Sequence, residues 1–329
     1  MPLLLALLFW GCEPAQPFLP ASDVYRVDLP AGFPEMPVIP GNELTQSRVE
    51  LGKLLFFDPA MSRDRTISCG SCHFQEYGFS DPVPLSIGVD GRKSLRNSSP
   101  LVNLAWRESF FRDGGVRTLE LQVLAPITDH LEMDFTIQGA VERMKENPQY
   151  VQLSRAAYGR EPDAFVLTRA ISAYERTLIS GNSRYDRYTN YGESVLTAQE
   201  LRGMELFFSE RTNCGGCHGG FNLSNEEFAN NGRYVAGADS GRMRVTQFEG
   251  DRGRFKVPTL RNIAETFPYM SDGELATLDD VVEHYRTGIV PHPNLSPLIP
   301  AEGISITDSE KADLVAFLGT FSDAEFLGK

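Results

Sequence analysis

The pentapeptide Cys69-Gly70-Ser71-Cys72-His73 has a second copy of the same pattern in this chain, Cys214-Gly215-Gly216-Cys217-His218. Two thiols at this spacing can add to the two vinyl groups of one haem while the adjacent imidazole reaches the iron. A zinc site would need further thiol or imidazole ligands at matching spacings, and the sequence offers none. The motifs therefore predict two covalently attached haem c groups. The attaching residues are Cys69, Cys72, Cys214 and Cys217, and the proximal iron ligands are His73 and His218.

The fifth cysteine, Cys12, lies in a short apolar segment at the start of the chain. Residues 2–11 are apolar, too short to span a bilayer, and end in a small residue before the cysteine. The segment resembles a bacterial lipoprotein signal, but the basic residues expected at its start are missing, which leaves open a start further upstream. We interpret residues 1–20 as a leader and linker with a lipid anchor at Cys12. Bacteria attach haem to such motifs outside the cytoplasm, so we expect an exported, periplasmic protein.

Length and charge bound the possibilities further. The chain has 329 residues, 41% of them apolar, and a formal net charge of −13. It is long enough for two ordinary domains. The acidity argues against nucleic acid as a partner. It would attract a basic electron-donor protein, and it equally fits a solvated surface that keeps an exported protein in solution.

Sequence similarity between the two halves accompanies the two motifs. Gly-x-x-Leu-Phe-Phe precedes each motif, at 52–57 and at 203–208. Asn-x-Ala follows each motif, at 103–105 and at 262–264, and an Asp-Gly pair comes ten residues after each asparagine. Matching order and spacing predict a duplicated haem domain. We expect an N-terminal domain over 21–192 and a C-terminal domain over 193–329.

Local patterns favour helices over strands. Thr197 with Glu200, Thr277 with Asp280, and Thr307 with Glu310 fit the capping box that opens a helix. Apolar spacing predicts a helix over 165–178, with Gly181 as its stop. Loops rich in Gly and Pro fill 80–100 and 220–258. The fold class is therefore mainly α, with two cytochrome c-like haem domains and long loops.

The chain resembles the bacterial di-haem cytochrome c peroxidase family, which includes the MauG-type enzymes. The resemblance runs from about Gly41 to Leu327. The segments that carry it are Arg96-Asn97-Ser98-Ser99-Pro100, residues 111–114, Gln122, Pro126, Glu132-Met133, residues 255–262 and Pro268-Tyr269-Met270. The resemblance implies that peroxide reacts at the N-terminal haem and that the C-terminal haem stores or delivers electrons.

Peroxide cleavage needs an iron with an open coordination position and a base that takes a proton and returns it to the departing oxygen. The resemblance assigns this acid-base role to Glu132 and places Gln122 and Pro126 in the same pocket.

The chain departs from conventional members beside the first haem. A histidine in a Ser-Ile-Gly-His segment caps that iron in many of them, whereas this chain reads Ser86-Ile87-Gly88-Val89. Valine cannot ligate iron, so we predict a first haem that is five-coordinate or water-bound at rest and needs no reductive activation. His130 is the nearby imidazole that could reverse this prediction, and its alternative is an ordinary loop histidine.

The distal ligand of the second haem is the next departure. The resemblance places Tyr285 where conventional peroxidases use methionine and MauG-type enzymes use tyrosine. A thioether raises the haem potential, whereas a phenolate favours ferric and higher-valent iron. Tyr285 could instead be a core tyrosine, with Met270 or Met243 as the ligand.

Between the haems, family members commonly carry a tryptophan relay in a Phe-Trp-Asp-Gly segment. This chain has Phe111-Arg112-Asp113-Gly114. Arginine cannot hold a radical as indole can, but the Arg112 guanidinium could anchor a haem propionate. Trp106 could substitute as the relay, or could pack in the core.

The resemblance also implies a calcium ion between the domains. Asn97, Thr266 and Pro268 match the family's ligand positions, an amide side chain and two backbone carbonyls. Such neutral oxygens suit calcium, with waters completing the shell.

Three functions remain. The first is a peroxidase that reduces hydrogen peroxide with electrons from a small redox protein, a cytochrome c or a copper protein. The second is a MauG-like enzyme that uses peroxide to oxidise a protein or organic substrate, which Tyr285 and Val89 favour. The third is a di-haem electron carrier without turnover, which Glu132 and Gln122 argue against. The resemblance also implies a homodimer.

Overall fold

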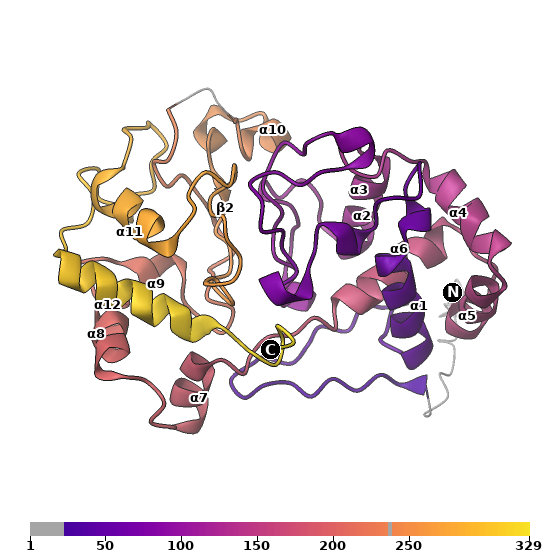
Figure 1. The fold of residues 1–329 in the computed structure, drawn as a ribbon, viewed down its shortest axis with the longest axis horizontal. Coiled ribbons are helices and arrows are strands. Elements are labelled where there is room, and N and C mark those ends of the chain that lie inside the picture. The colour runs from indigo at the N-terminus through magenta and orange to yellow at the C-terminus, as the bar shows by residue number, and fades with distance from the viewer. Residues whose placement is uncertain (1–22, 236–238) are drawn as a thin grey trace, which may run out of the picture.

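The chain folds into two helical lobes that lie side by side (Figure 1). The computed structural model describes residues 23–235 and 239–329. Helices α1 to α6 lie in one lobe and α7 to α12 in the other, and long loops meet between them (Figure 1). The mainly helical class with long loops is confirmed. The leader and Cys12 lie outside the described residues.

The secondary structure consists of twelve α-helices, one short antiparallel strand pair and several single-turn 3-10 helices among the described residues. The α-helices are α1 (Gln46–Phe57), α2 (Leu119–Gln122), α3 (Leu124–Thr128), α4 (Ile137–Glu146), α5 (Pro148–Tyr158), α6 (Ala164–Glu175), α7 (Arg184–Tyr191), α8 (Ala198–Phe207), α9 (Cys214–Cys217), α10 (Met243–Thr246), α11 (Leu278–Thr287) and α12 (Asp308–Leu318). The strands are β1 (Phe228–Ala229) and β2 (Phe255–Lys256). Within the described ranges, none of these helices combines the length and apolarity needed to cross a bilayer.

Each lobe is built around one close helix pair. In the N-terminal lobe, α1 packs on α6, and a Cβ atom at Gly52 would overlap the carbonyl oxygen of Ala170. In the C-terminal lobe, α8 packs on α12, and a Cβ atom at Gly203 would overlap the carbonyl oxygen of Asp313. The glycine of each Gly-x-x-Leu-Phe-Phe segment therefore lets two backbones touch.

The three capping boxes predicted from the sequence are present. Thr197, Thr277 and Thr307 each accept a hydrogen bond from the backbone amide three residues later, and the acidic residue there bonds back. They begin α8, α11 and α12. These local signals fix the start of each main helix of the C-terminal lobe.

The helix predicted over 165–178 is shorter than expected. It is α6, which begins after the cap Asp163 and ends at Glu175. Gly181 does not end it. A Cβ atom at Gly181 would overlap Pro30 and Phe33, so this glycine instead admits the N-terminal segment against the loop.

The end of each lobe's last helix is tied down by an asparagine in the left-handed conformation. Asn103 donates its backbone N–H to Leu178 and accepts the backbone N–H of Ser180 on Oδ1 at 2.9 Å. Asn262 does the same with Phe321 and Asp323, the latter at 2.8 Å. In each lobe one asparagine thus holds the chain segment that follows the helix through two hydrogen bonds, one from its backbone N–H and one to its side-chain oxygen.

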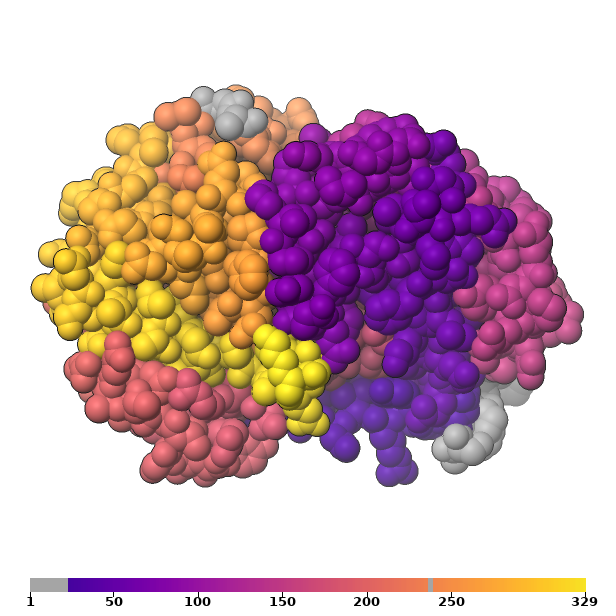
Figure 2. All heavy atoms as spheres, viewed as in Figure 1, coloured from indigo at the N-terminus to yellow at the C-terminus, as the bar shows by residue number. Residues whose placement is uncertain are grey.

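Helix α7 belongs to the C-terminal lobe, and the C-terminal tail crosses to the N-terminal lobe. Helix α7 packs on the C-terminal core, because its Asp186 forms a buried ion pair with Arg261 at 2.9 Å. The C-terminal tail reaches the other lobe, where the Phe326 carbonyl accepts a hydrogen bond from Gln75 at 2.9 Å. Figure 2 shows this tail, in yellow, lying against the violet N-terminal lobe.

Candidate functional site

The first haem motif presents its histidine ready for a metal. Cys69–Ser71 form a single 3-10 turn, and Cys72 and then His73 follow it. The Nδ1 atom of His73 lies 2.7 Å from the carbonyl oxygen of Phe79, so this nitrogen carries the proton and Nε2 keeps its lone pair. Burial lowers the pKa of His73 to about 4, which keeps the ring neutral. A neutral, oriented imidazole is the form that ligates iron.

The second motif is built in the same way. Its cysteines begin and end the short helix α9, and Nδ1 of His218 lies 3.3 Å from the carbonyl oxygen of Leu223. Burial lowers the pKa of His218 to about 4 as well. Phe79 and Leu223, the acceptors in the two lobes, both have positive φ, 55° and 49°. In both lobes, therefore, a residue with positive φ, which is uncommon outside glycine, points its carbonyl oxygen at the imidazole.

A large apolar cavity adjoins the second motif. It has a volume of about 230 Å³. Cys214, Cys217 and His218 line it, and most of its other lining side chains are aliphatic or aromatic. Its walls include Val257, Pro258, Leu260, Ile263, Leu278, Val282, Ile299, Leu314 and Leu318. Two thiols, an oriented imidazole and an apolar enclosure are the donor set and surroundings that a covalently bound haem requires.

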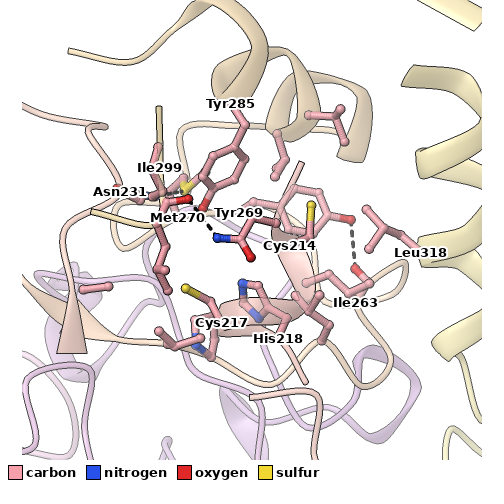
Figure 3. A pocket seen from close by; sticks show the side chains of 18 of the residues that line it. Cys214, Cys217, His218, Asn231, Ile263, Tyr269, Met270, Tyr285, Ile299 and Leu318 are labelled. Atoms are coloured by element: carbon pink, nitrogen blue, oxygen red, sulfur yellow. Dashed lines mark hydrogen bonds between the residues drawn. The ribbon is translucent and has the colours of Figure 1, made fainter. Parts of the chain in front are cut away.

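Two sequence-predicted distal ligands reach this cavity. Figure 3 shows Tyr285, from α11, and Met270 on the side opposite His218. Asn231 donates from Nδ2 to the Met270 sulfur at 3.4 Å, which uses the thioether as an acceptor. Met243 does not line the cavity. The structure therefore brings Tyr285 and Met270 to one site and leaves Met243 elsewhere.

In the N-terminal lobe, Glu132 lies on a loop held against the Val89 segment. The backbone N–H of Val89 donates to the carbonyl oxygen of Glu132 at 2.8 Å. A Cβ atom at Gly88 would overlap the Glu132 carbonyl oxygen, so the contact requires a glycine. Arg92 ties the same two loops together by donating to the carbonyl of His130 at 2.6 Å and to Asp134 at 2.9 Å.

The carboxyl of Glu132 has an unusual proton affinity. Burial, with a smaller contribution from Asp129, raises its pKa to about 7. Its charge is also among the causes that raise the pKa of the Cys69 and Cys72 thiols, after their burial. Glu132 therefore lies near the first haem motif, with a proton affinity suited to acid-base work at neutral pH.

The other residues that the resemblance places with Glu132 differ in burial and in hydrogen bonding. The Oε1 atom of Gln122, at the end of α2, is buried and lacks a hydrogen-bond partner among the described residues. Such an orphaned acceptor fits a site that receives a polar ligand. Pro126 lies within α3 and is partly buried. His130 points to solvent, with 74% of its side chain exposed.

The two residues predicted between the haems lie at different places. Arg112 lines the cavity of the second motif. Trp106 packs edge-on against Phe33 and Phe221, at centroid distances of 5.5 and 5.4 Å, and its indole N–H donates to the carbonyl of Glu35 at 3.3 Å. Trp106 thus belongs to an aromatic cluster beneath the N-terminal segment.

The three positions implied for calcium lie in loops that meet at the lobe boundary. Asn97 is buried and donates its backbone N–H to Ser271 at 2.8 Å, which joins it to the segment that carries Thr266 and Pro268. Its side-chain oxygen already accepts a hydrogen bond from Arg112 at 2.9 Å. The one side-chain ligand of the implied set is therefore engaged by a cation of the chain itself.

Sequence reasoning did not identify two polar residues of the second cavity. Asn231 and Lys256 both line it, and the Lys256 ammonium donates to Ser109 at 2.7 Å and to Glu226 at 3.1 Å. Lys256 stands in a segment already singled out by the resemblance, which was a usable signal. Asn231 lies in a long loop where no spacing or periodicity distinguishes it.

Comparisons with known proteins agree with this site. A family model described as di-haem cytochrome c peroxidase matches residues 46–194. Methylamine utilization protein MauG of Methylorubrum extorquens is 37% identical over 283 residues, which cover 85% of this chain and 79% of that protein. Cytochrome c551 peroxidase of Pseudomonas aeruginosa is 34% identical over 252 residues, which cover 74% of this chain and 72% of that protein.

A solved structure shares the whole architecture. The crystal structure of a MauG-like protein associated with microbial copper homeostasis matches with a TM-score of 0.85 and 33% identity, covering 92% of this chain and 97% of that one. Identity and coverage of this size, together with two cysteine pairs that each present an oriented histidine, assign the chain. It belongs to the di-haem cytochrome c peroxidase family, whose members carry two haem c groups, and is an oxidoreductase of the peroxidase class.

Proposed function

We propose that hydrogen peroxide reacts at the N-terminal haem, with Glu132 as the acid-base residue. The observation that carries this proposal is a loop carboxyl near the first motif whose pKa is raised to about 7 by burial. At neutral pH such a group is present in both protonation states, so it can accept a proton and give it back. A pure electron carrier has no use for this arrangement.

The proposed chemistry divides simply between cofactor and protein. A bound haem would supply the iron and the electrons for cleavage of the O–O bond. Glu132 would take a proton from one peroxide oxygen and return it to the other, which would leave as water. The orphaned Oε1 of Gln122 accepts a hydrogen bond from bound peroxide or water and so orients it. The Val89 amide holds the Glu132 loop in place.

An open distal face on the first haem follows from comparing the lobes by register. Asn103 with Asn262 and Thr118 with Thr277 are pairs separated by 159 positions, with the same local geometry within each pair. By the same offset, Pro126 of the first lobe is the sequence equivalent of Tyr285 of the second. Proline has no side-chain ligand atom, whereas tyrosine has one. This correspondence also supports our proposal that the lobes arose by duplication, although helix α7, which precedes the boundary near 192 suggested by the sequence, packs on the C-terminal core.

At the second haem we propose Tyr285 as the distal ligand, with Met270 as the alternative. Tyr285 lies opposite His218 (Figure 3). Asn231 donates to the Met270 sulfur and also hydrogen-bonds the Tyr285 side chain, so this contact does not distinguish the two candidates, and the resemblance is what favours the tyrosine. A phenolate ligand stabilises oxidised iron, so the second haem would store oxidising equivalents rather than act as a high-potential electron store.

We further propose that Arg112 anchors a propionate of the second haem. It lines the cavity, and two of its three guanidinium nitrogens are used by Asn97. The third, Nη1, has no partner among the described residues and is available for a carboxylate. A relay role for Trp106 stays a prediction, and its neighbours Phe33 and Phe221 give it a packing role in any case.

Two fates of the oxidising equivalents fit this site. In the first, a small redox protein, a cytochrome c or a copper protein, supplies the electrons and the net reaction is reduction of peroxide to water. In the second, a protein or organic substrate is oxidised, as the relation to MauG suggests. Tyr285 in the second cavity favours the second fate. We propose an exported protein, since haem attachment to these motifs takes place outside the cytoplasm.

The deciding experiment uses the haem-loaded protein and peroxide. Electron paramagnetic resonance of the resting protein should show one high-spin and one low-spin ferric haem. Two fully low-spin haems would contradict the open first iron. Peroxide with reduced cytochrome c should then give turnover in the first case, and a long-lived oxidised state with no donor oxidation in the second. Inertness toward peroxide would refute both.

A further inference from the structure

Asn97 is saturated with contacts. Its side-chain Oδ1 and its backbone oxygen both accept from Arg112, at 2.9 and 3.2 Å, and its Nδ2 donates to the carbonyl of Val83 at 3.2 Å. Its backbone N–H donates to the carbonyl of Ser271, in the other lobe, at 2.8 Å. Asn97 is 5% exposed, so water does not compete for these atoms. Arg112 therefore holds the residue that joins the two lobes.

The guanidinium of Arg112 is enclosed and charged. Burial lowers its pKa to about 10, so it remains protonated at neutral pH. Among the described residues, no carboxylate pairs with it directly, although Asp272 acts on it at longer range. Its backbone oxygen accepts the N–H of Lys256 at 2.7 Å, a second link to the C-terminal lobe. One residue thus brings a fixed positive charge to the boundary.

A calcium ion does not fit beside this group. Calcium would need the Oδ1 lone pairs of Asn97, and the other implied ligands, the carbonyls of Thr266 and Pro268, are neutral as well. A divalent cation on that oxygen would lie only a few ångströms from the guanidinium, and none of the three implied ligands is a carboxylate that would offset the repulsion. In an enclosed site this repulsion is poorly screened.

Neighbouring residues show that the boundary is built from arginines on both sides. Asp113, which is fully buried, accepts from Arg96 at 2.8 Å and from Arg244, of the other lobe, at 2.7 Å. Arg96 in turn makes two hydrogen bonds to Asp239, at 2.8 and 2.9 Å. Ion pairs of this kind join the lobes directly and need no metal between them.

We propose that Arg112 takes the place of the calcium ion at the lobe boundary, so that this protein joins its haem lobes without a metal. The guanidinium supplies the positive charge and the fixed geometry that an ion would supply to Asn97. Arginine stands at position 112, where the family usually has tryptophan, and this same arginine engages Asn97. A single substitution would thus account for both departures from the family.

The test measures calcium content and thermal stability of the haem-loaded protein, independently of its activity. We expect wild-type protein to carry no stoichiometric calcium after a chelator and desalting, and to show the same unfolding midpoint with and without added calcium. Arg112→Met removes the charge and frees Asn97, so its midpoint should rise with added calcium and fall again with chelator. Arg112→Lys keeps the charge and should remain unresponsive.

Arg244→Met is the matched control, because it removes an arginine from the same boundary without touching Asn97. It should lose stability but gain no calcium response. One calcium per wild-type chain, or a wild-type midpoint that falls on chelation, would overturn the proposal. So would a folded Arg112→Met protein that ignores calcium. Should that variant fail to load haem, Arg112→Gln provides the same comparison, and the wild-type measurements stand by themselves.

Discussion

The two lobes use the same construction around their haem motifs and differ at one matching position of the sequence. Gly52 and Gly203 each bring two helices into backbone contact, and each proximal histidine donates to a carbonyl held at positive φ. At the matching register position, however, one lobe has Pro126 and the other Tyr285. The comparison teaches that backbone contacts maintain the shared construction of the two lobes. The side chain at the matching position can therefore differ without changing the fold.

Replacing the proposed acid-base residue should give the largest effect, because only the reaction at the first lobe depends on it. Glu132→Gln keeps the size of the side chain but cannot accept and return a proton, so the rate constant for the peroxide reaction should fall by about 10²–10⁴-fold. Stopped-flow absorbance of the first haem measures it. Glu142→Gln, an exposed acid on α4, is the control and should react normally. A Glu132→Gln protein that reacts at the wild-type rate would end the proposal.

The shared construction is tested by Gly52→Ala and Gly203→Ala. Each added methyl would overlap a carbonyl oxygen of the crossing helix, so each should destabilise its lobe by about 1–3 kcal/mol. Denaturant unfolding of the haem-loaded protein gives this free energy. Gly319→Ala, where a Cβ would meet nothing within 4 Å, should change little. Tolerance at only one of the two crossings would break the comparison between the lobes.

The pH dependence of the peroxide reaction should belong to the first lobe alone. Only the ionised form of Glu132 accepts a proton, and its pKa is raised to about 7, so the rate should fall by about tenfold per unit well below pH 7. Asp129 is one cause of the raised pKa, so Asp129→Asn should move the inflection to lower pH. A profile without an inflection near neutrality, or one that this substitution leaves in place, would exclude Glu132 as the titrating group.

The smallest effect on reactivity is expected from the second lobe. Tyr285→Phe removes the proposed ligand oxygen and should change the spectrum of the second haem, while the initial reaction of the first haem with peroxide keeps its rate. Tyr269→Phe is a matched control, because Tyr269 lines the same cavity but donates to the carbonyl of Ile263 at 2.9 Å. An unchanged spectrum in Tyr285→Phe would point to Met270.

Local patterns in the sequence were sufficient for the haem motifs and for the starts of the main helices. Thr277 and Asp280 are three residues apart, and the capping box that they form depends on nothing else in the molecule. The end of α6 was misplaced because Gly181 is required by a contact with Pro30 and Phe33, residues about 150 positions away. Contacts between residues so far apart in the chain produce no periodic pattern in the sequence.

The packing of α7 and the hydrogen bonding of Asn97 could not be predicted from the sequence either. The ion pair of Asp186 with Arg261 fixes α7 on the C-terminal core, and no local pattern in the sequence pairs these two residues. Asn97 matched a ligand position, yet its oxygen is engaged by Arg112, a contact between two loops that only the folded chain brings together. A motif identifies a residue type at a position, but not what else competes for its atoms.

The tail that ends near Phe326 has a consequence for how the protein is assembled. The hydrogen bond from Gln75 to the Phe326 carbonyl joins residues 251 positions apart, and Phe79 packs on Phe326 with ring centroids 5.7 Å apart. The loop that positions His73 therefore gains these two contacts only when the last residues of the chain dock against it.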